Sequence, residues 1–356
     1  MLLTVTLLLV IISLVTLYTG KVQNFEHKII VNEQSQILAK AKSEEILLRV
    51  IARLNTDKAL VKSISNTAII SEAYTSVYGN VEVLTNGKKL ITLTANGQSP
   101  DGLATAQTRE QVMIYPMVFN SPISPIIVKG GVTSEGELEV VANPDGLGSG
   151  KHLSIWSDAS ISFVTSKHHT CLKADFDKGD CLNMALSKES GKSNDVIESS
   201  VNFPSSLSEY LFNIETEELS ELKSEAKFVF SDCEQLDNKS YGVIWIEGDC
   251  ELDFNIEVGS VTNPVVLVVM DGHINFLDNS IVNGLVCSFR SNDSGINLVV
   301  NMHSGAFIRG ALISNHPLGT YNSVTRVIYE QQVASALVAA DSLQMLAKVP
   351  GSWHNF

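Results

Sequence analysis

The chain opens with LLTVTLLLVIISLVTLYT, residues 2–19, a stretch without a charged side chain. A helix rises 1.5 Å per residue, so about 19 residues span about 29 Å, close to the hydrocarbon thickness of a bilayer. The stretch is rich in Leu, Ile and Val, and no later apolar run is long enough to span. The sequence therefore predicts a single membrane anchor in this stretch.

A cleaved secretory signal is the alternative interpretation of the same stretch. Such a signal has a basic segment, a shorter apolar run and a cleavage site with small residues, and none of these is clear around residues 1–20. Lys21 and Lys28 follow the apolar run, so the positive-inside rule alone favours a cytoplasmic tail. We expect a short basic leader to be missing before Met1, and hence an exported tail.

The anchor continues into a polar helix that we expect to end near residue 55. Pro is absent before Pro100, and Gly20 is the only early glycine. Apolar residues recur at spacings of seven and four, which indicates an amphipathic helix with one apolar stripe. The members of this stripe are Ile30, Ile37, Ala41 and Leu48. We expect the stripe to pack against other helices or against the head of the protein.

The net charge of −14 excludes the usual basis of nucleic-acid binding, which is neutralisation of phosphates by Lys and Arg. Two cysteine pairs lie close in sequence, Cys171 with Cys181 and Cys233 with Cys250. A disulfide that closes so short a loop contributes roughly 3 kcal/mol, so we predict both links and an oxidising compartment. Cys287, in an apolar run, is predicted to be a buried free thiol; five reduced core cysteines are the alternative.

The predicted fold class is α+β: a long N-terminal helix followed by a mainly β head. We expect four segments along the chain. They are an anchor and stalk helix at 1–55, an α/β first part of the head at 56–164, a disulfide-containing loop and helix insertion at 165–240, and a β region with a C-terminal segment at 241–356.

Local patterns predict three further elements. A second helix is expected over 59–74, and a hairpin is expected around Asn86-Gly87, which is a strong signal for a two-residue turn. Residues 203–212 have the pattern of a capped helix start.

A weak internal repeat marks the last segment. IVNGLVCS at 281–288 resembles FIRGALIS at 307–314, and their glycines, Gly284 and Gly310, are 26 residues apart. Short strands that recur with Gly and Asn at the corners are typical of the stacked rungs of a β-solenoid. A two-sheet sandwich is the alternative, and a solenoid of two or three rungs would need capping.

Several short motifs contain residue types that are found in catalytic, metal-binding or phosphate-binding sites. Gly191-Lys192-Ser193 lacks the first glycine of a phosphate-binding loop. The run His168-His169-x-Cys171 is interpreted as an exposed loop rather than a metal site. The acidic stretch Asp175, Asp177 and Asp180 lacks the calcium-loop pattern. We therefore expect no catalytic, cofactor-binding or metal-binding residue in this chain.

The three tryptophans received separate predictions. Trp156 and Trp245 lie in apolar strands and are expected in the core. Trp353, behind Pro350-Gly351, is expected to dock back on the head; a contact with a partner is the alternative.

Taken together, these features resemble the PilX-type minor pilins, which are type IV pilus assembly proteins. The apolar opening, the stretch KAKSEEIL at 40–47, NPDGLGSG at 143–150 followed by LSIWS at 153–157, and VPGSW at 349–353 carry the resemblance. It implies a helical stalk bundled in the pilus core and an exposed globular head. The chain departs from the usual pilin pattern, because no basic leader is present and the first acidic residue is Glu26.

The missing early acid has a physical interpretation. A carboxylate inside an apolar helix bundle is costly unless it is paired, and in a major pilin it pairs with the terminal amine of the neighbouring subunit. A subunit without a neighbour on that side needs no such acid, which favours a tip or initiating position; loss without positional meaning is the alternative.

The resemblance implies a structural protein that promotes pilus assembly or is displayed at or near the pilus tip. Its expected partners are other pilin and minor pilin subunits and the membrane, with a tip adhesin as a further candidate and with no nucleic acid and no cofactor. The expected location is the inner membrane, with one pass and a periplasmic head, and then the pilus or cell surface. The alternatives are a membrane-anchored adhesin or polysaccharide-binding protein and, less favoured, an enzyme that acts on polysaccharide.

Overall fold

The chain forms two compact units in the computed structural model, Met1–Tyr115 with Met345–Phe356 (unit 1) and Pro116–Gln344 (unit 2). The structure describes residues 2–64, 68–84, 88–134, 136–215, 219–291, 298–320 and 323–356. Unit 2 is therefore inserted between two parts of unit 1. Pairing between distant strands produces this division, which differs from the four consecutive segments expected from the sequence.

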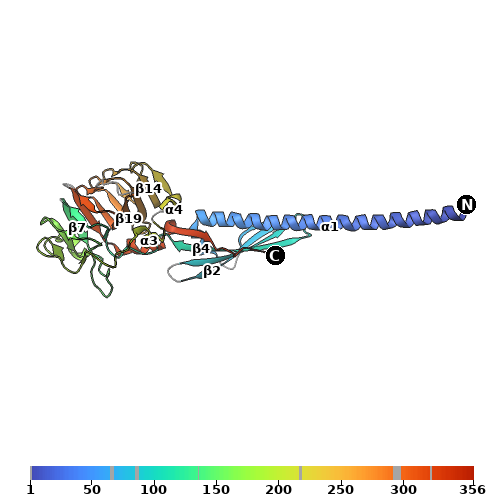
Figure 1. Ribbon diagram of the computed structural model, residues 1–356, viewed down its shortest axis with the longest axis horizontal. Coiled ribbons are helices and arrows are strands. Elements are labelled where there is room, and N and C mark those ends of the chain that lie inside the picture. Colours follow the sequence, from blue (N-terminus) through green and yellow to red (C-terminus); the bar gives the residue numbers. More distant parts are fainter. Residues whose placement is uncertain are drawn as a thin grey trace. The chain divides into compact units, whose positions relative to one another are not determined.

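Unit 1 begins with one continuous helix, α1 (Leu2–Thr56), as predicted. From Leu3 to Ile30 every residue is exposed, and the C-terminal part of the helix buries one face. That face consists of Ser35, Ala39, Ser43, Ile46, Leu47, Val50, Ile51 and Leu54. Figure 1 shows the N-terminal half of α1 extending beyond the strands of the same unit.

The partner of that face is an antiparallel sheet in the order β1-β2-β3-β4-β24, with β25 paired to β4. The strands are β1 (Ala68–Glu72), β2 (Thr75–Val83), β3 (Lys89–Gln98), β4 (Thr105–Pro116), β24 (Gln344–Lys348) and β25 (His354–Asn355). Burial alternates along β3, as expected for a sheet with one packed face. Val77, Ile91, Leu93 and Val112 share a core cluster with Ile46, Leu47 and Leu54 of α1.

The residues that follow α1 form a hairpin, as predicted, but not the second helix that was also predicted. The predicted hairpin exists, because β2 pairs with β3 in antiparallel register, while its turn at Asn86-Gly87 lies outside the described residues. The predicted helix over 59–74 is wrong: this stretch forms the 3-10 helix η1 (Lys58–Ser63) and strand β1. Ile70 and its neighbours pair with β2, so sheet pairing prevails over helix propensity.

A glycine sets how closely α1 approaches the sheet. A β-carbon at Gly97 of β3 would overlap the backbone of α1 at Ala39 and Ser43. Beside it the Ser43 and Thr108 hydroxyls lie 2.7 Å apart and are buried. The contact therefore depends on small side chains from both elements.

Unit 2 is built from parallel strands of successive chain turns. β14 (Gly242–Glu247), β17 (Val265–Met270), β19 (Ile281–Phe289) and β21 (Phe307–Ser314) pair side by side. A second parallel row joins β15 (Cys250–Leu252), β18 (Ile274–Phe276) and β20 (Val300–Met302). Gly284 and Gly310, the two repeat glycines, are direct neighbours in this register.

The stack also includes residues far from the predicted repeat region. β5 (Ile126–Val128) pairs in parallel with β21, and β8 (Ile155–Ser157) pairs with β5. Likewise β7 (Glu137–Val141) pairs with β23 (Val324–Ile328) and with β10 (His168–Cys171). Residues 126–171 therefore extend the same sheet, which corrects their assignment to a separate first part of the head and to a loop insertion.

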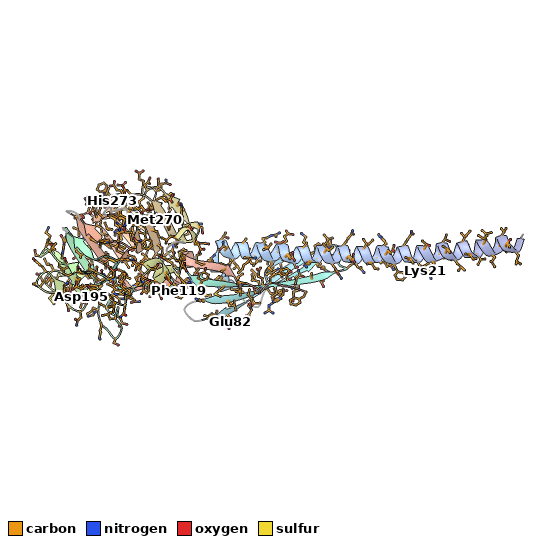
Figure 2. All side chains as sticks on the ribbon, viewed as in Figure 1. Lys21, Glu82, Phe119, Asp195, Met270 and His273 are labelled. Atoms are coloured by element: carbon orange, nitrogen blue, oxygen red, sulfur yellow. A yellow bond between two sulfur atoms is a disulfide. The ribbon has the colours of Figure 1, made fainter. Side chains whose placement is uncertain are left out.

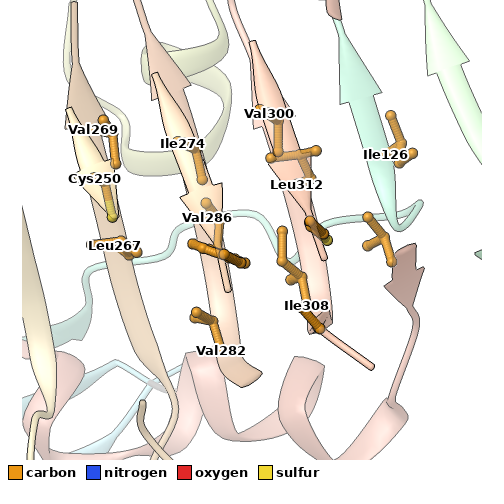
Figure 3. Packing of buried hydrophobic residues seen from close by; sticks show 14 of the residues in the cluster. Ile126, Cys250, Leu267, Val269, Ile274, Val282, Val286, Val300, Ile308 and Leu312 are labelled. Atoms are coloured by element: carbon orange, nitrogen blue, oxygen red, sulfur yellow. The ribbon is translucent and has the colours of Figure 1, made fainter. Parts of the chain in front are cut away.

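The core of unit 2 runs through all of these turns (Figure 3). Ile126, Leu267, Val286, Ile308 and Leu312 are each fully buried in one cluster. Burial of each such aliphatic side chain contributes roughly 1.5–3 kcal/mol. The additional turns supply the core that two or three rungs alone would lack.

Short helices complete unit 2. α3 (Leu207–Phe212) begins as predicted, with the Ser206 hydroxyl accepting from the Glu209 N–H at 3.1 Å, and α5 (Gln331–Ala339) packs against β19 and β21. The other described elements are β6 (Val132–Ser134), β9 (Ile161–Ser162), β11 (Ser187–Lys188), β12 (Val196–Ile197), β13 (Phe228–Phe230), β16 (Glu257–Val258), β22 (Leu318–Thr320), α2 (Lys173–Phe176), α4 (Leu219–Ser224) and η4 (Asp341–Leu343).

Gly284 lies where β19 stops pairing with β16 and begins to pair with β17. Its φ is +149°, and a β-carbon there would overlap the Val265 carbonyl oxygen. We expect Gly284→Ala to lower the free energy of unfolding by about 3 kcal/mol or more, because both the backbone angle and the close contact oppose a side chain.

Urea unfolding of the full chain measures this effect. Gly191→Ala is the matched control, because nothing lies within 4 Å of the added β-carbon. Equal stability of the two variants would contradict the assigned role of Gly284.

A buried histidine in unit 2 is held in its neutral form. His316 Nδ1 donates to the Pro317 carbonyl oxygen at 3.0 Å, so Nε2 accepts from the Ser288 hydroxyl at 2.9 Å. Burial lowers the pKa of His316, and the nearby Arg290 lowers it further, while the Pro317 carbonyl and Asp271 oppose the shift.

We expect this histidine to make unit 2 less stable in mild acid. The unfolded chain takes up a proton near pH 6.5 while the folded chain resists it, so stability present above that pH is lost as the pH falls. Urea midpoints measured from pH 8 to pH 5 should therefore decline. His316→Gln should flatten the decline, whereas His303→Gln, at an exposed position, should leave it in place; an unchanged decline in His316→Gln would refute this assignment.

Candidate functional site: the exposed face of the N-terminal helix

The predicted stripe lies on the side of α1 that faces away from the sheet. At 100° per residue, Ile30, Ile37, Ala41 and Leu48 fall within about 40° of one another around the helix axis. Ala39 and Val50, on the buried face, lie about 160° to 180° from Leu48 in the same projection. The helix therefore has two opposed faces, and the sheet covers only one of them.

All four members of the stripe are exposed. Ile30, Ile37 and Leu48 keep 51%, 66% and 54% of their surface accessible, and Ala41 is also exposed. Aliphatic side chains gain free energy when they leave water, so a row of them along one helix face indicates a packing surface. Whether other helices cover this surface remains a prediction.

The first part of α1, residues 2–19, carries no charged side chain on any side of the helix. Its mean hydropathy and length are those of a membrane span, and none of the corresponding window is buried in the chain itself. Figure 2 shows side chains projecting from both visible sides of the helix near Lys21. A helix that is hydrophobic all round requires burial in lipid or in a protein core.

Three hydroxyl groups within residues 2–19 are satisfied inside the helix. Ser13, Thr16 and Thr19 donate to the carbonyl oxygens of Leu9, Ile12 and Val15 at 2.8, 3.0 and 2.7 Å. Such i−4 bonds remove the need for water, which is absent from a bilayer core. The helix can therefore enter lipid without an unpaired hydroxyl at these three positions.

Ion pairs occupy one flank of the polar half of the helix. Glu45 contacts Lys42 at 3.0 Å and Arg49 at 2.8 Å, and Arg49 also reaches Glu72 of β1 at 3.0 Å. A hydrogen bond from Lys42 lowers the pKa of Glu45, and one with Glu72 raises the pKa of Arg49. These exposed pairs contribute little stability, but they place charge beside the stripe rather than on it.

The two predicted disulfides are present in unit 2. Cys171 is joined to Cys181 and Cys233 to Cys250, with Cα–Cα distances of 5.3 and 4.8 Å. Cys287 is free and buried, and burial raises the pKa of its thiol.

The predicted exposed loop at His168-His169 is wrong, because both residues are buried in strand β10. His168 Nδ1 accepts from the Val164 N–H at 3.1 Å, so its Nε2 donates to the Gly136 carbonyl oxygen at 2.8 Å. β10 pairs in parallel with β7, which lies far from it in the sequence. The residues around position 168 therefore give no local pattern from which this pairing, and the burial of the two histidines, could be predicted.

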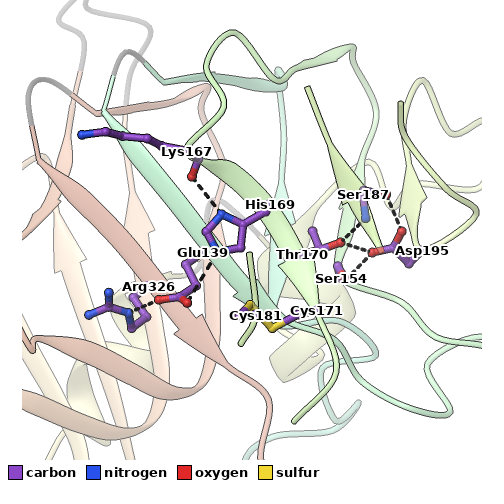
Figure 4. Close-up of a disulfide and its surroundings, with 10 residues drawn as sticks. All are labelled: Glu139, Ser154, Lys167, His169, Thr170, Cys171, Cys181, Ser187, Asp195 and Arg326. Carbon is purple, nitrogen blue, oxygen red and sulfur yellow. Dashed lines mark hydrogen bonds and ion pairs between the residues drawn. A yellow bond between two sulfur atoms is a disulfide. The ribbon is translucent and has the colours of Figure 1, made fainter. Parts of the chain in front are cut away.

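His169 belongs to a cluster that has the composition of a metal site (Figure 4). Ligand-type atoms of Glu139, His169 and Cys181 lie within 4.8 Å of one another. The Cys181 sulfur is already bonded to Cys171, and metals bind thiolates. Arg326 holds Glu139 in an ion pair, so the cluster is better explained as structural.

The neighbours of Glu139 also shift the pKa of its carboxylate. Burial raises the pKa of Glu139, but hydrogen bonds from His169 and Arg326 outweigh that effect and lower it. Glu139 therefore serves as the anionic partner that keeps Arg326 in place.

A buried aspartate near this cluster was missed by sequence reasoning. Asp195 is 4% exposed and accepts hydrogen bonds from the hydroxyls of Ser154, Thr170 and Ser187 at 2.6, 2.6 and 2.5 Å. These partners come from three separate strands or loops, as Figure 4 shows. No signal in the sequence links residues so far apart, and the arrangement ties segments together rather than forming a site.

The remaining candidate motifs have structural partners. Asp175 and Asp177 pair with Lys178 and Lys173 at 3.9 and 2.5 Å. Lys192, of the incomplete phosphate-binding motif, pairs with Glu198 at 2.6 Å. Within the described ranges these groups do not converge on one point.

The tryptophans follow their predictions in part. Trp156 and Trp245 are buried, and the Trp156 N–H reaches the Ser200 hydroxyl at 3.1 Å. The C-terminal segment docks on β4 through the bond from Val349 N–H to the Gln111 carbonyl at 2.9 Å. Trp353 itself stays 49% exposed, so its expected docking applies to the backbone and not to the indole.

Comparison with known proteins adds little to this description. No family model and no curated protein matches the chain. A solved structure, the competence-associated pilin ComZ from Thermus thermophilus, aligns with 90% of this chain and 98% of its own at 10% identity and a TM-score of 0.27. A likeness at that score is too weak to carry an argument about this chain.

The disulfides give a test of the compartment and of unit 2. A digest without reduction should yield Cys171 linked to Cys181 and Cys233 linked to Cys250. Replacing both cysteines of one pair by serine should lower the free energy of unfolding by roughly 2–4 kcal/mol, because the open loop regains conformational freedom. Cys287→Ala is the control and should leave both links intact; recovery of a link through Cys287 would contradict the pairing.

Proposed function

We propose that this chain is an accessory, or minor, pilin-like structural protein that promotes assembly of a type IV pilus or is displayed at or near its tip. The observation that carries the proposal is that different parts of α1 have different surroundings. The sheet covers one face of its C-terminal half, while the stripe on the opposite face and the uncharged residues 3–19 are apolar and exposed.

A helix bundle is the environment that satisfies both exposed regions. In a bundle of similar helices the stripe Ile30, Ile37, Ala41 and Leu48 packs against neighbouring subunits, and each aliphatic side chain contributes roughly 1.5–3 kcal/mol. The spacings of seven and four suit helix-on-helix packing. The partners are other pilin and minor pilin subunits, which share this kind of helix.

Before assembly, the membrane takes the place of the bundle. We propose that residues 2–19 cross the inner membrane once, and that the sheet of unit 1 and the whole of unit 2 lie in the periplasm until the chain joins the pilus at the cell surface. Two disulfides agree with an oxidising compartment. In this scheme the chain is not an enzyme, and its described clusters of polar residues serve the fold.

An adhesin is the second candidate function. The stacked parallel strands of unit 2 place polar side chains at successive turns, such as Glu251 beside Asn275 at 2.7 Å. A polar ladder of this kind is compatible with polysaccharide binding. It needs no helix bundle, so the two functions differ in what a change on α1 does.

The substitution Ile37→Asp separates these possibilities. It places an unpaired charge on the stripe, which burial in a bundle strongly disfavours, while the sheet-facing side of α1 is untouched. We expect a folded, membrane-bound protein and surface piliation lowered more than about tenfold. Shear-released pili are quantified by immunoblot, beside membrane fractions.

Asn32→Asp is the matched control, because it adds the same charge on the opposite side of the helix at an exposed position. It should assemble as the wild type does. Wild-type piliation in the Ile37→Asp strain would overturn the bundle mechanism. In a deletion strain, normal pili with weaker attachment would favour the adhesin, and normal pili with a lost activity on polysaccharide would favour an enzyme.

A further inference from the structure

The sheet of unit 1 carries a groove of about 660 Å³ on the face turned away from α1. Pairing register brings its members together, because Ser76 lies opposite Asn96 and Asn96 lies opposite Gln107. Residues two apart on a strand point to the same side, so Tyr78 lies on the same side as Ser76, and Tyr74 of the preceding turn also lines the groove. The groove therefore lies across three neighbouring strands.

Aromatic rings border this groove. Tyr74, Tyr78 and Phe356 are lining residues and remain 53%, 43% and 72% exposed. Large aromatic surfaces left open in a concavity are typical of ligand sites. Neither the helix-facing core nor the strand pairing accounts for their exposure.

Tyr74 is held there in an unusual backbone conformation. Its φ is +68°, in the tight connection between β1 and β2. A left-handed residue in such a turn is normally Gly, Asn or Asp, and a bulky residue is an outlier. The Tyr74 side chain is 53% exposed, so packing in the core does not account for a bulky residue at this position.

Amides form the floor between the rings. Gln107 Nε2 donates to Asn96 Oδ1 at 3.0 Å, and Asn96 Nδ2 lies 3.5 Å from the Ser76 hydroxyl. Each amide has two donor hydrogens and an acceptor oxygen with two lone pairs. The network therefore orients these groups and leaves capacity for a ligand.

The charge of the groove selects the ligand class. Among its described lining residues the one acidic side chain is that of Glu72, and Arg49 pairs with it through contacts of 3.0 Å. The described lining holds no basic side chain, so it gives phosphate or carboxylate groups of a ligand no counterion. Hydroxyls and amides with exposed rings match a neutral sugar, whose C–H face stacks on aromatic rings while its hydroxyls bond to amides.

We propose that this groove binds a neutral oligosaccharide. The site lies on the antiparallel sheet, and it is independent of both the helix stripe and the stacked strands of unit 2. It would let the protein hold a surface glycan whether or not it assembles into a pilus.

Titration of the full chain with neutral hexasaccharides tests the proposal. The probes are hexamers of N-acetylglucosamine, glucose and mannose, with an oligogalacturonate as the charged comparison. The protein is kept in a detergent that carries no sugar, because a maltoside headgroup would compete. At least one neutral hexamer should bind with a Kd of about 1 mM or tighter, and more tightly than the oligogalacturonate.

Variants locate the binding. Tyr74→Ala and Tyr78→Ala should each weaken it about tenfold, whereas Tyr78→Phe, which keeps the ring, should bind nearly as the wild type does. Phe254→Ala, at an exposed aromatic residue of unit 2, is the matched control, and circular dichroism checks that each variant is folded. Ile37→Asp should also bind normally, which separates this site from pilus assembly.

Absence of binding by every neutral hexamer would overturn the proposal. So would tighter binding of the oligogalacturonate, or binding that Tyr74→Ala and Tyr78→Ala leave unchanged in folded protein.

Discussion

Close packing of α1 on the antiparallel sheet decides what unit 1 presents to its surroundings. Gly97 lets the helix backbone approach at Ala39 and Ser43, the Ser43 and Thr108 hydroxyls meet beside it, and the apolar contacts from Ile46 onward follow. A helix held this tightly cannot rotate about its axis. The orientation of its free face, and equally the concave face on the far side of the sheet, are consequences of this one contact.

Unit 2, by contrast, buries the apolar side chains of many short strands. Parallel strands of successive turns stack their aliphatic side chains in one continuous core, and glycine corners such as Gly284 allow β19 to change direction within it. The order of the stack departs from the order of the chain, because β5 and β7 follow β21 and β23 in space. Disulfides and the Asp195 network then secure the peripheral segments.

Features that depend on neighbouring residues were open to prediction from the sequence. The continuous α1, the capped start of α3 and the two disulfides rest on local spacing, and the glycine repeat matched the register of Gly284 and Gly310. Features that depend on pairing between residues far apart in the chain could not be predicted from the sequence. The helix expected over 59–74 yielded to pairing of β1 with β2, the buried histidines of β10 needed β7 as a partner, and the groove at Tyr74 and Asn96 exists only once three strands align.

The insertion of unit 2 between β4 and β24 has a mechanical consequence. Those strands are neighbours in the sheet of unit 1, and the chain leaves the unit after Tyr115 and returns at Met345. Any tension between the two units therefore runs through two covalent crossings, and each carries only part of the load. Cleavage of one crossing alone would therefore leave the two units covalently joined through the other.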